Sequence, residues 1–512
     1  MPLRCIWLAK ALNSTTISVE DRALVEATIR ATARKSFFHW ELEFPEVFFG
    51  ARLGTTRIVE RLEAAGFDAV IGNPPYDVLA SEELGYDVSA DLEFYESVSA
   101  FAPAIRGKKN LYKLFICRGA GLMSSSGAFA FIVPMALLGD DHAAGVRRLL
   151  VENTGISAIE AFPQKDDPHN RVFPEAKLAT TIFVTHAQSQ NGRFTVRTHT
   201  GRYIAAESPK VEPTPKQIIA FDPENSPIPT CTQRDWDIAI RIINLDHIKR
   251  FGDYCHASQG EVNETTDGKR GFISSNPKDG PPILRGSNIC LYALREASQG
   301  EAIYLRTRKY LQGKPDSIKA RHHEQRRVAW QESSPQNNFR RIIAAPIPVG
   351  QFCNHKINYI AESDAKLAID FILAILNSKA SDWFFRLGSS NAAVSHYQIY
   401  NLPAPAISQA PISSPWNALM RAGRWAELCS CLGNACTELA VIPKEVAGAL
   451  AEMSRRIQEI EAHRVLKARS ERSHLASDSQ PIQDAIDAIL FRCYGLSDDD
   501  ANYIQARLKE ML

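Results

Sequence analysis

Short apolar runs recur in the first part of the chain and predict buried strands. They are residues 67–72 (FDAVIG), 128–134 (AFAFIVP) and 178–185 (LATTIFVT). Each has the length of a strand rather than of a helix, and such continuous runs suit strands that are covered on both faces. Residues 37–44 (FFHWELEF) alternate between apolar and polar positions up to Pro45, which also predicts a strand.

Helical patterns separate these runs. Residues 9–34 have mixed polarity without glycine, residues 111–122 are amphipathic, and residues 147–152 predict a further helix. Residues 124–127 (SSSG) predict a turn. Strands that alternate with helices imply an α/β fold with a parallel sheet, whose ligands bind at the carboxyl ends of the strands.

Two proline-rich stretches divide the chain, one over residues 209–229 and one near residues 403–415. We therefore expect an α/β domain over residues 1–208, a linker over 209–229, a mixed α/β domain over 230–412 and helices over 413–512.

The tetrapeptide Asn73-Pro74-Pro75-Tyr76 follows the strand predicted at residues 67–72. Methylation of an exocyclic amine requires the nitrogen lone pair, which is delocalised into the ring. Hydrogen-bond acceptors for both amine hydrogens can make this lone pair available. The Asn73 side-chain oxygen and the Pro74 carbonyl can act as that pair, and the prolines keep the loop stiff. Tyr76 can stack on the base, which must be flipped out of the duplex. The alternative is an ordinary turn, since Asn-Pro-Pro suits turns in general; the preceding strand and the helix–strand alternation that follows favour the functional interpretation.

Further segments in the same order resemble the adenine-specific methyltransferases of type IIG restriction–modification systems and their relatives in phage-defence islands. The segment 67–76 (FDAVIGNPPY) is similar to motif IV of that family, and 172–177 (VFPEAK) is similar to its motif VIII. The other matching segments of the first half are 38–48 (FHWELEFPEVF), 110–115 (NLYKLF) and 127–134 (GAFAFIVP). The resemblance implies a Rossmann-like class I methyltransferase domain in which Phe173 faces Tyr76 across the flipped adenine.

The resemblance continues through the second half. Four segments resemble landmarks of the family's target-recognition domain and of its C-terminal helix: 259–263 (QGEVN), 282–289 (PILRGSNI), 373–403 and 486–496 (IDAILFRCYGL). The resemblance therefore implies that residues 1–208 are a partial catalytic domain and that residues 230–412 read DNA. The implied activity is that of a site-specific, adenine-specific DNA methyltransferase.

The methyl donor of the family is S-adenosylmethionine, which binds a glycine-rich loop after the first strand of the catalytic domain. Only 72 residues precede Asn73, and the nearest glycine pair, Gly50 and Gly54, lacks the acidic neighbour of that loop. We therefore expect a fragment, a misplaced start or one polypeptide of a split enzyme that an upstream polypeptide completes. No room remains for the family's N-terminal nuclease, so no DNA cleavage is expected.

Two other functions stay open. A non-catalytic DNA-binding specificity subunit, or an inactive fragment, would not need the whole of Asn73 to Tyr76. A glutamine methyltransferase that acts on protein uses the same tetrapeptide but has no C-terminal domain of roughly 300 residues.

Composition and charge add little. The net charge is +1, yet five arginines (Arg321, Arg326, Arg327, Arg340 and Arg341) fall within one short stretch. They predict either a stripe that neutralises phosphates or a solvated face. By residue type, the candidates for contact with double-stranded DNA are Arg285, Asn288, Arg306, Arg308, Lys309, Arg326, Arg327, His396 and Tyr397.

The ten cysteines form no CxxC pair and suit a reducing cytoplasm, so we expect no metal site. The chain has no signal peptide and no apolar stretch of membrane-spanning length. These features predict a cytoplasmic protein.

Overall fold

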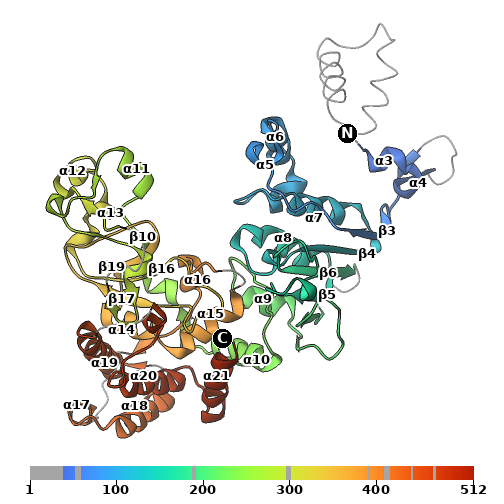
Figure 1. Ribbon diagram of the computed structural model, residues 1–512. Helices are drawn as coiled ribbons and strands as arrows, with labels where there is room; N and C mark the ends of the chain where they lie inside the picture. The colour runs from blue at the N-terminus through green and yellow to red at the C-terminus, as the bar shows by residue number, and fades with distance from the viewer. Residues whose placement is uncertain are drawn as a thin grey trace. The chain divides into compact units, whose positions relative to one another are not determined.

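The computed structural model describes residues 38–51, 59–186, 192–295, 301–389, 392–408, 416–439, 442–464 and 469–511 (Figure 1). The helix predicted at residues 9–34 lies outside these residues. The chain divides into two compact units: residues 1–133, 148–159 and 182–192 form the first, and residues 134–147, 160–181 and 193–512 form the second.

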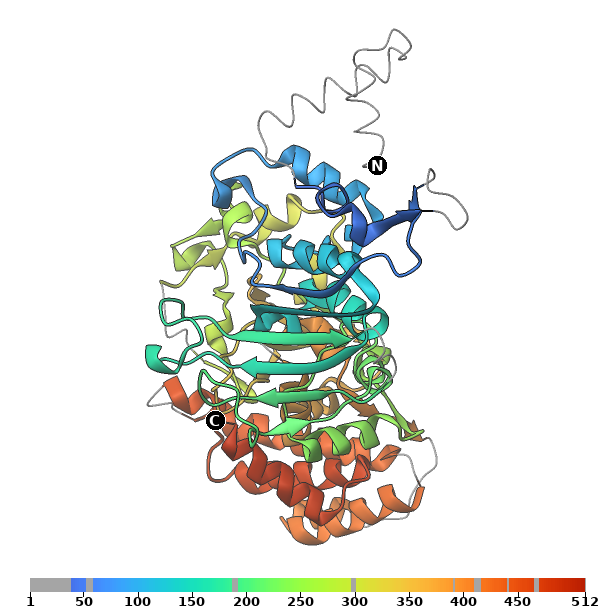
Figure 2. The same cartoon turned by 90° about the vertical axis from the view of Figure 1, so that its right-hand side faces the viewer.

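One sheet contains six strands: β3 (Phe67–Gly72), β4 (Met123–Pro134), β5 (Ile156–Phe162), β6 (Thr180–His186), β7 (Thr195–Thr198) and β8 (Lys210–Val211). Their order is β3-β4-β6-β5-β7-β8, and Figure 2 shows these strands side by side. β3 pairs with β4 in parallel, whereas β7 and β8 are antiparallel. β3 is therefore an edge strand among the residues that the structure describes.

The strands and helices around the tetrapeptide follow the sequence prediction. β3 and α7 (Leu111–Leu122) have the predicted bounds, and β6 begins two residues later than expected. The helix predicted near residue 150 is present as α8 (Ala144–Arg148) and the π-helical turn η4 (Leu149–Asn153). Continuous apolar runs of strand length were sufficient to locate the strands, although β3 itself contains exposed positions.

The strand predicted at residues 37–44 is wrong, because this segment forms the short helices α3 (Trp40–Glu43) and α4 (Pro45–Phe48). The helical turn brings the rings of Trp40 and Phe44 into a stack with centroids 6.0 Å apart, and each ring meets the edge of Phe67 at 5.5 Å. Aromatic side chains four residues apart lie on one helical face, so packing against Phe67 outweighs the alternating pattern.

The turn predicted at residues 124–127 is also wrong, since this polar run begins β4. Met123 pairs with Phe67 and Ala128 pairs with Ala69, so the register shifts between these pairs to accommodate three extra residues of β4. A Cβ on Gly127 would lie 2.7 Å from the Phe67 carbonyl oxygen, so glycine permits this close approach. Pairing with β3 therefore overrides the low strand propensity of serine and glycine.

The proline-rich segment 209–229 contains regular structure, although the sequence predicts a linker. β8 pairs with β7, and α9 (Pro215–Phe221) follows with a capping box between Thr214 and Gln217. Pro215 occupies the first helical turn, where a missing N–H costs nothing. The predicted domain boundaries themselves stay predictions.

A second sheet lies within the second unit. Its strands are β10 (Cys255–Gln259), β16 (Arg327–Gln331), β17 (Ala344–Ile347) and β19 (Ile357–Ala365), in the antiparallel order β10-β19-β16-β17. Helix α14 (Ile369–Leu376) is buried along its whole length and contacts β16, β17 and α19 (Lys444–Ala462). A helix that is apolar on every side requires such cover on every side.

The C-terminal part is mostly helical, as the sequence predicts, and its helices lie together in Figure 1. With α19 they are α17 (Trp416–Arg421), α18 (Trp425–Leu439), α20 (Gln480–Cys493) and α21 (Asp498–Glu510). α20 packs against both α18 and α19.

The remaining α-helices are α5 (Ser81–Leu84), α6 (Ser89–Ser97), α10 (Gln233–Ile243), α11 (Glu264–Lys269), α12 (Thr307–Gln312), α13 (Ile318–Arg321), α15 (Lys379–Gly388) and α16 (His396–Tyr400). The remaining strands are β1 (Phe49–Ala51), β2 (Val59–Arg61), β9 (Ile248–Arg250), β11 (Ile273–Ser274), β12 (Ile283–Leu284), β13 (Ile289–Cys290), β14 (Ala293–Leu294), β15 (Tyr304–Leu305), β18 (Phe352–Cys353), β20 (Pro403–Pro405), β21 (Ile407–Ser408) and β22 (Ile442–Pro443).

Two glycines of α7 test how closely this helix packs on the sheet. A Cβ on Gly119 would lie 2.7 Å from the Phe129 ring, whereas a Cβ on Gly121 would meet nothing within 4 Å. We expect Gly119→Ala to destabilise the protein by about 1–3 kcal/mol through overpacking. Gly121→Ala should stabilise it by roughly 0.5–1 kcal/mol through helix propensity. Thermal unfolding midpoints measure both changes, and equal shifts in the same direction would contradict the packing of α7 against β4.

Candidate active site and nucleic-acid interface

Asn73 follows directly after the last residue of β3, so its position is set by how β3 meets β4. Gly72 pairs with Phe131, and a Cβ on Gly72 would lie 2.7 Å from the Phe131 ring. Only glycine allows β3 to end in this close contact. Asn73 is exposed, Pro74 is buried and Pro75 is exposed, so the asparagine side chain projects from a loop whose backbone is anchored.

The loop after Asn73 is held by the segment that precedes α7. The Leu111 amide donates to the Asp77 carbonyl at 2.8 Å, and the Leu79 amide donates to the Lys109 carbonyl at 2.9 Å. Asn110 Nδ2 donates to the Tyr76 carbonyl at 3.3 Å. Three hydrogen bonds thus join a loop to the start of a helix, which keeps the loop in one conformation.

Tyr76 is partly buried and its position is also fixed. Its hydroxyl donates to the Ile132 carbonyl of β4 at 3.2 Å. Burial raises the pKa of Tyr76 to about 12, so the phenol is protonated at neutral pH. The ring is therefore held as a neutral aromatic surface and is not poised to exchange protons.

Phe173 lies in the second compact unit, where it is partly buried. The Ala176 amide donates to the Phe173 carbonyl at 3.1 Å, and Arg171 binds the carbonyls of Lys165 and Pro174. The loop that carries Phe173 is thus organised by backbone contacts. Its stacking against Tyr76 stays a prediction.

The described residues do not fit an S-adenosylmethionine site of the expected kind. Gly50 lies in β1, which pairs with β2 in a separate two-stranded ribbon, and Gly54 lies outside the described residues. No loop with closely spaced glycines follows a strand of the six-stranded sheet within the described ranges.

Asp140, Asp141 and His142 bring three possible metal-ligand atoms within 4.8 Å of one another. Carboxylate oxygens of Asp140 and Asp141 both accept from the His142 amide, at 2.8 and 2.9 Å. These oxygens organise a local turn, and turn formation is sufficient to explain the cluster.

Two of the residues proposed for DNA contact are internal. Arg327 is fully buried, with Nη1 2.7 Å from Glu261 Oε1, and its Nη2 donates to the Gln351 carbonyl. Asn288 is buried as well, and it accepts from the Arg285 amide and donates to the Arg295 carbonyl. Both side chains are committed to folding contacts, so the expectation that they touch DNA is not supported by their positions.

Three further candidates are paired with carboxylates. Arg285 forms two 3.0 Å hydrogen bonds with Glu264, Arg306 pairs with Asp279, and Arg326 pairs with Asp370. Burial alone would raise the pKa of Glu264, but hydrogen bonds from Arg285 and Asn354 lower it. Arg308 and Lys309, in contrast, are exposed on α12.

The five-arginine stretch is not a surface stripe. Arg327, Arg340 and Arg341 are buried, while Arg321 pairs with Glu324 and Arg326 with Asp370. Burial lowers the pKa of Arg341 to about 10. Clustering along the sequence did not place these charges together on a face because β16 and the turn before β17 direct them inward.

His396 and Tyr397 begin α16, which Ser395 caps. Their ring centroids lie 4.1 Å apart, and Tyr397 is exposed. Burial lowers the pKa of His396, so the imidazole is neutral at pH 7. A neutral, half-buried histidine adds no charge for phosphate.

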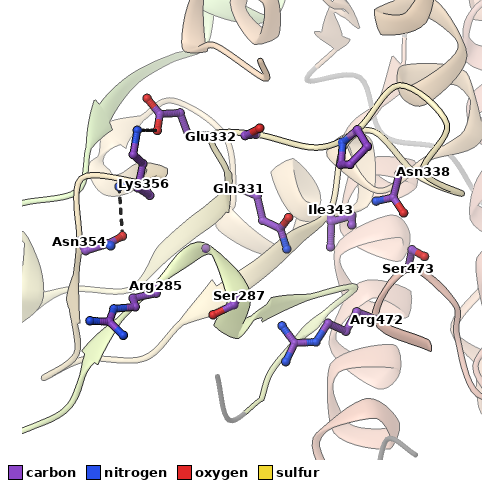
Figure 3. Close-up of a pocket in the computed structure, with 13 residues that line it drawn as sticks. Arg285, Ser287, Gln331, Glu332, Asn338, Ile343, Asn354, Lys356, Arg472 and Ser473 are labelled. Atoms are coloured by element: carbon purple, nitrogen blue, oxygen red, sulfur yellow. Dashed lines mark hydrogen bonds and ion pairs between the residues drawn. The ribbon is translucent and has the colours of Figure 1, made fainter. Parts of the chain in front are cut away.

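A cavity of about 670 Å³ in the second unit was not predicted from the sequence (Figure 3). Its wall brings together segments that are far apart in the chain: Arg285–Ser287, Gln331–Ser333, Asn354, Lys356 and Arg472–Ser473. Of the residues proposed from sequence, only Arg285 lines it. The other lining residues come together only in the folded structure, so no motif along the sequence could identify them.

Residues 6–168 match the family model described as Eco57I restriction-modification methylase. This match supports a DNA methyltransferase role for the part of the chain that carries Asn73 to Tyr76. The search of curated proteins gave no match.

Solved structures of restriction–modification proteins are also similar to this chain. The type IIL restriction–modification enzyme MmeI in complex with DNA is 12% identical with a TM-score of 0.47, covering 86% of this chain and 56% of its own. The type IIG restriction endonuclease BpuSI is 12% identical with a TM-score of 0.31, covering 84% and 54%. A type I methyltransferase subunit from Streptococcus thermophilus is 19% identical with a TM-score of 0.21, covering 27% of each chain. The chain thus spans little more than half the length of MmeI and BpuSI.

Within the described residues, no helix combines the length and the apolar character needed to cross a bilayer.

The Arg327–Glu261 pair distinguishes a folding role from a DNA-binding role. Arg327→Leu leaves the Glu261 carboxylate buried without its cation, which typically costs about 3–5 kcal/mol. We expect a lower thermal midpoint for this variant and an unchanged midpoint for Arg308→Ala, because exposed substitutions have small effects. If Arg327→Leu unfolds like the unsubstituted chain but binds DNA more weakly, the assignment of Arg327 to the core is wrong.

Proposed function

We propose that this chain is the adenine-binding and target-recognition part of a site-specific DNA adenine-N6 methyltransferase of a restriction–modification or phage-defence system. The observation that carries the proposal is the exposed Asn73 at the carboxyl end of a parallel strand, on a loop tied to the start of α7. Ligands of parallel sheets bind at this end of the strands. The match to restriction-modification methylases over residues 6–168 supports it.

The proposed chemistry follows from the acceptors that the loop offers. Asn73 Oδ1 and the Pro74 carbonyl accept the two N6 hydrogens of a flipped adenine. When acceptors hold both amine hydrogens, lone-pair density returns from the ring to N6, which makes that nitrogen more nucleophilic. Pro75 has no amide hydrogen to compete for these acceptors, and the anchored loop avoids reorganisation during the reaction. The methyl donor supplies the electrophilic carbon.

The aromatic groups would hold the base. Tyr76 is a neutral ring fixed through its hydroxyl, and stacking on such a ring is worth about 1–3 kcal/mol per base. Phe173 would provide the opposite face, as its sequence context predicts. A flipped base needs both faces covered because it has lost its stacking in the duplex.

We propose further that another polypeptide segment completes the methyl-donor site beside β3. β3 is an edge strand among the described residues, and Ile71 on it is 83% exposed. Other large apolar side chains exposed in the same unit are Phe38, Phe44, Val59, Leu62, Tyr86, Phe94 and Phe115. An apolar edge strand and a concentration of exposed apolar groups favour a protein partner.

A non-catalytic specificity subunit is the second candidate. A specificity subunit would account equally well for the expectation that the second unit binds DNA. It gives no reason for an exposed asparagine on a loop whose backbone is fixed by three hydrogen bonds, which is why the catalytic proposal is preferred.

Asn73 provides the direct test. Transfer of labelled methyl from S-adenosylmethionine to unmethylated DNA is measured for the chain alone and together with the polypeptide encoded immediately upstream. We expect Asn73→Ala to lower the rate at least about 100-fold, as loss of a single preorganised polar group does elsewhere. The exposed Asn434→Ala in α18 should have no effect. Methyl transfer that persists in Asn73→Ala, or that falls on another base, would refute the proposal; DNA binding without methyl transfer in either preparation would favour the specificity subunit.

Substitutions at Tyr76 distinguish a stacking role of its ring from a role of its hydroxyl in proton transfer. Because its pKa is raised to about 12 from 10, the phenol is protonated below pH 10 in both the folded and the unfolded chain. Tyr76→Phe should therefore retain the pH profile of methyl transfer between pH 6 and 9, while Tyr76→Ala should lose about 10-fold or more with the stacking surface. The stability that Tyr76 contributes is complete below pH 10 and is lost as the pH rises towards 12. A Tyr76→Phe profile that differs from the unsubstituted one would assign the hydroxyl a chemical role.

A further inference from the structure

The cavity of about 670 Å³ in the second unit is lined by side-chain amides whose orientation is fixed, and Gln331 is one of them. Gln331 is the last residue of β16 and is only partly buried. Its Nε2 donates to the Ile289 carbonyl at 3.0 Å. A carbonyl can only accept, so the amide cannot be reversed without placing two oxygens against each other. Gln331 Oε1 therefore faces the cavity as an acceptor, and no described residue donates to it.

Two of the cationic side chains around the cavity are paired with neighbouring carboxylates. Arg285 is held by Glu264 through two hydrogen bonds, and Lys356 Nζ lies 3.0 Å from Glu332 Oε2. Figure 3 shows the Lys356–Glu332 pair on one side of the cavity and Arg472 on the other. Because Arg285 and Lys356 are already paired with carboxylates, neither cation is set aside for a phosphate. The cavity suits a neutral group that forms hydrogen bonds.

The surroundings of Gln331 leave it little freedom. Its backbone pairs with Ile357 of β19 in the sheet, and its amide is held by the Ile289 carbonyl. Asn354, on the same wall, is engaged through both ends of its amide, with Glu264 and with the Lys356 amide. Gln331 thus offers one acceptor in a fixed position, as a reading contact requires.

We propose that this cavity reads one base of the DNA target and that Gln331 determines the identity of that base. The inference rests on the proposed function and deepens it. In the major groove, adenine and cytosine present an amino group, whereas guanine and thymine present oxygen at the corresponding place. A fixed acceptor accepts from the first two bases and repels the second two. Gln331 cannot make the two-point contact with adenine that a free glutamine makes, because its donor is already committed to Ile289.

The test is selection of bound duplexes from a randomised DNA library by the full chain. We expect a site in which one position admits only adenine or cytosine on one strand. Gln331→Met keeps the side-chain length and removes the acceptor, so discrimination at that position should fall about 10-fold or more while the other positions stay unchanged. Gln312→Ala, an exposed glutamine of α12 that does not line the cavity, is the matched control.

A second step identifies the contact chemically. At the affected position, adenine is replaced by purine or cytosine by 2-pyrimidinone, each of which lacks only the amino group. The unsubstituted chain should bind this DNA about 10-fold more weakly, and Gln331→Met should bind both DNAs equally.

The outcomes separate this inference from the proposed function. A recognition site that is unchanged in Gln331→Met, measured on protein whose thermal midpoint is preserved, overturns the role of Gln331 alone. If that variant unfolds, the bases that lack the amino group test the unsubstituted chain alone, and equal binding of both DNAs overturns the inference. Failure of the unsubstituted chain to enrich any site contradicts both proposals, whereas selective binding without methyl transfer contradicts only the catalytic one.

Discussion

The close approach of β3 and β4 at Gly72 is the constraint on which the candidate active site depends. Since Gly72 pairs with Phe131 and leaves no space for a Cβ, β3 ends at a defined point and Asn73 leaves the sheet there. α7 completes the arrangement, because its first residues bind the loop while Gly119 lets the helix body rest on Phe129. Gly72, Gly119 and the hydrogen bonds between the loop and α7 together determine where the exposed Asn73 amide lies.

In the second unit, several charged side chains are buried and form contacts that hold the fold together. Arg327 and Glu261 are both buried and connect β16 with the turn after β10. Asp382 accepts from the backbone amides of Arg341 and Ile342, which fixes the entry to β17. Buried polar groups of this kind are tolerated because they are paired, and they specify how segments join. An arginine count along the sequence therefore says little about the surface.

The two proposed sites differ in how much they need from outside the described residues. The cavity around Gln331 is formed wholly within the second unit, from several separated segments. The adenine-binding loop is formed within the first unit, yet its strand β3 has an exposed edge. The proposed reading of the target can therefore be tested without the proposed methyl transfer.

The sequence alone determined the strand at 67–72, the helix at 111–122, the position of Asn73 to Tyr76 at a strand end and the helical C-terminal part. These features arise from continuous apolar runs or from local periodicity, which the residues themselves carry. Tertiary structure decided the rest. Aromatic packing on Phe67 made residues 40–48 helical, pairing with β3 drew Ser124 to Gly127 into a strand, and burial removed Arg327 and Asn288 from the surface. It also oriented Gln331 through a carbonyl 42 residues away. Contacts between distant segments outweigh local preferences of about 1 kcal/mol, so no pattern along the chain could have foretold them.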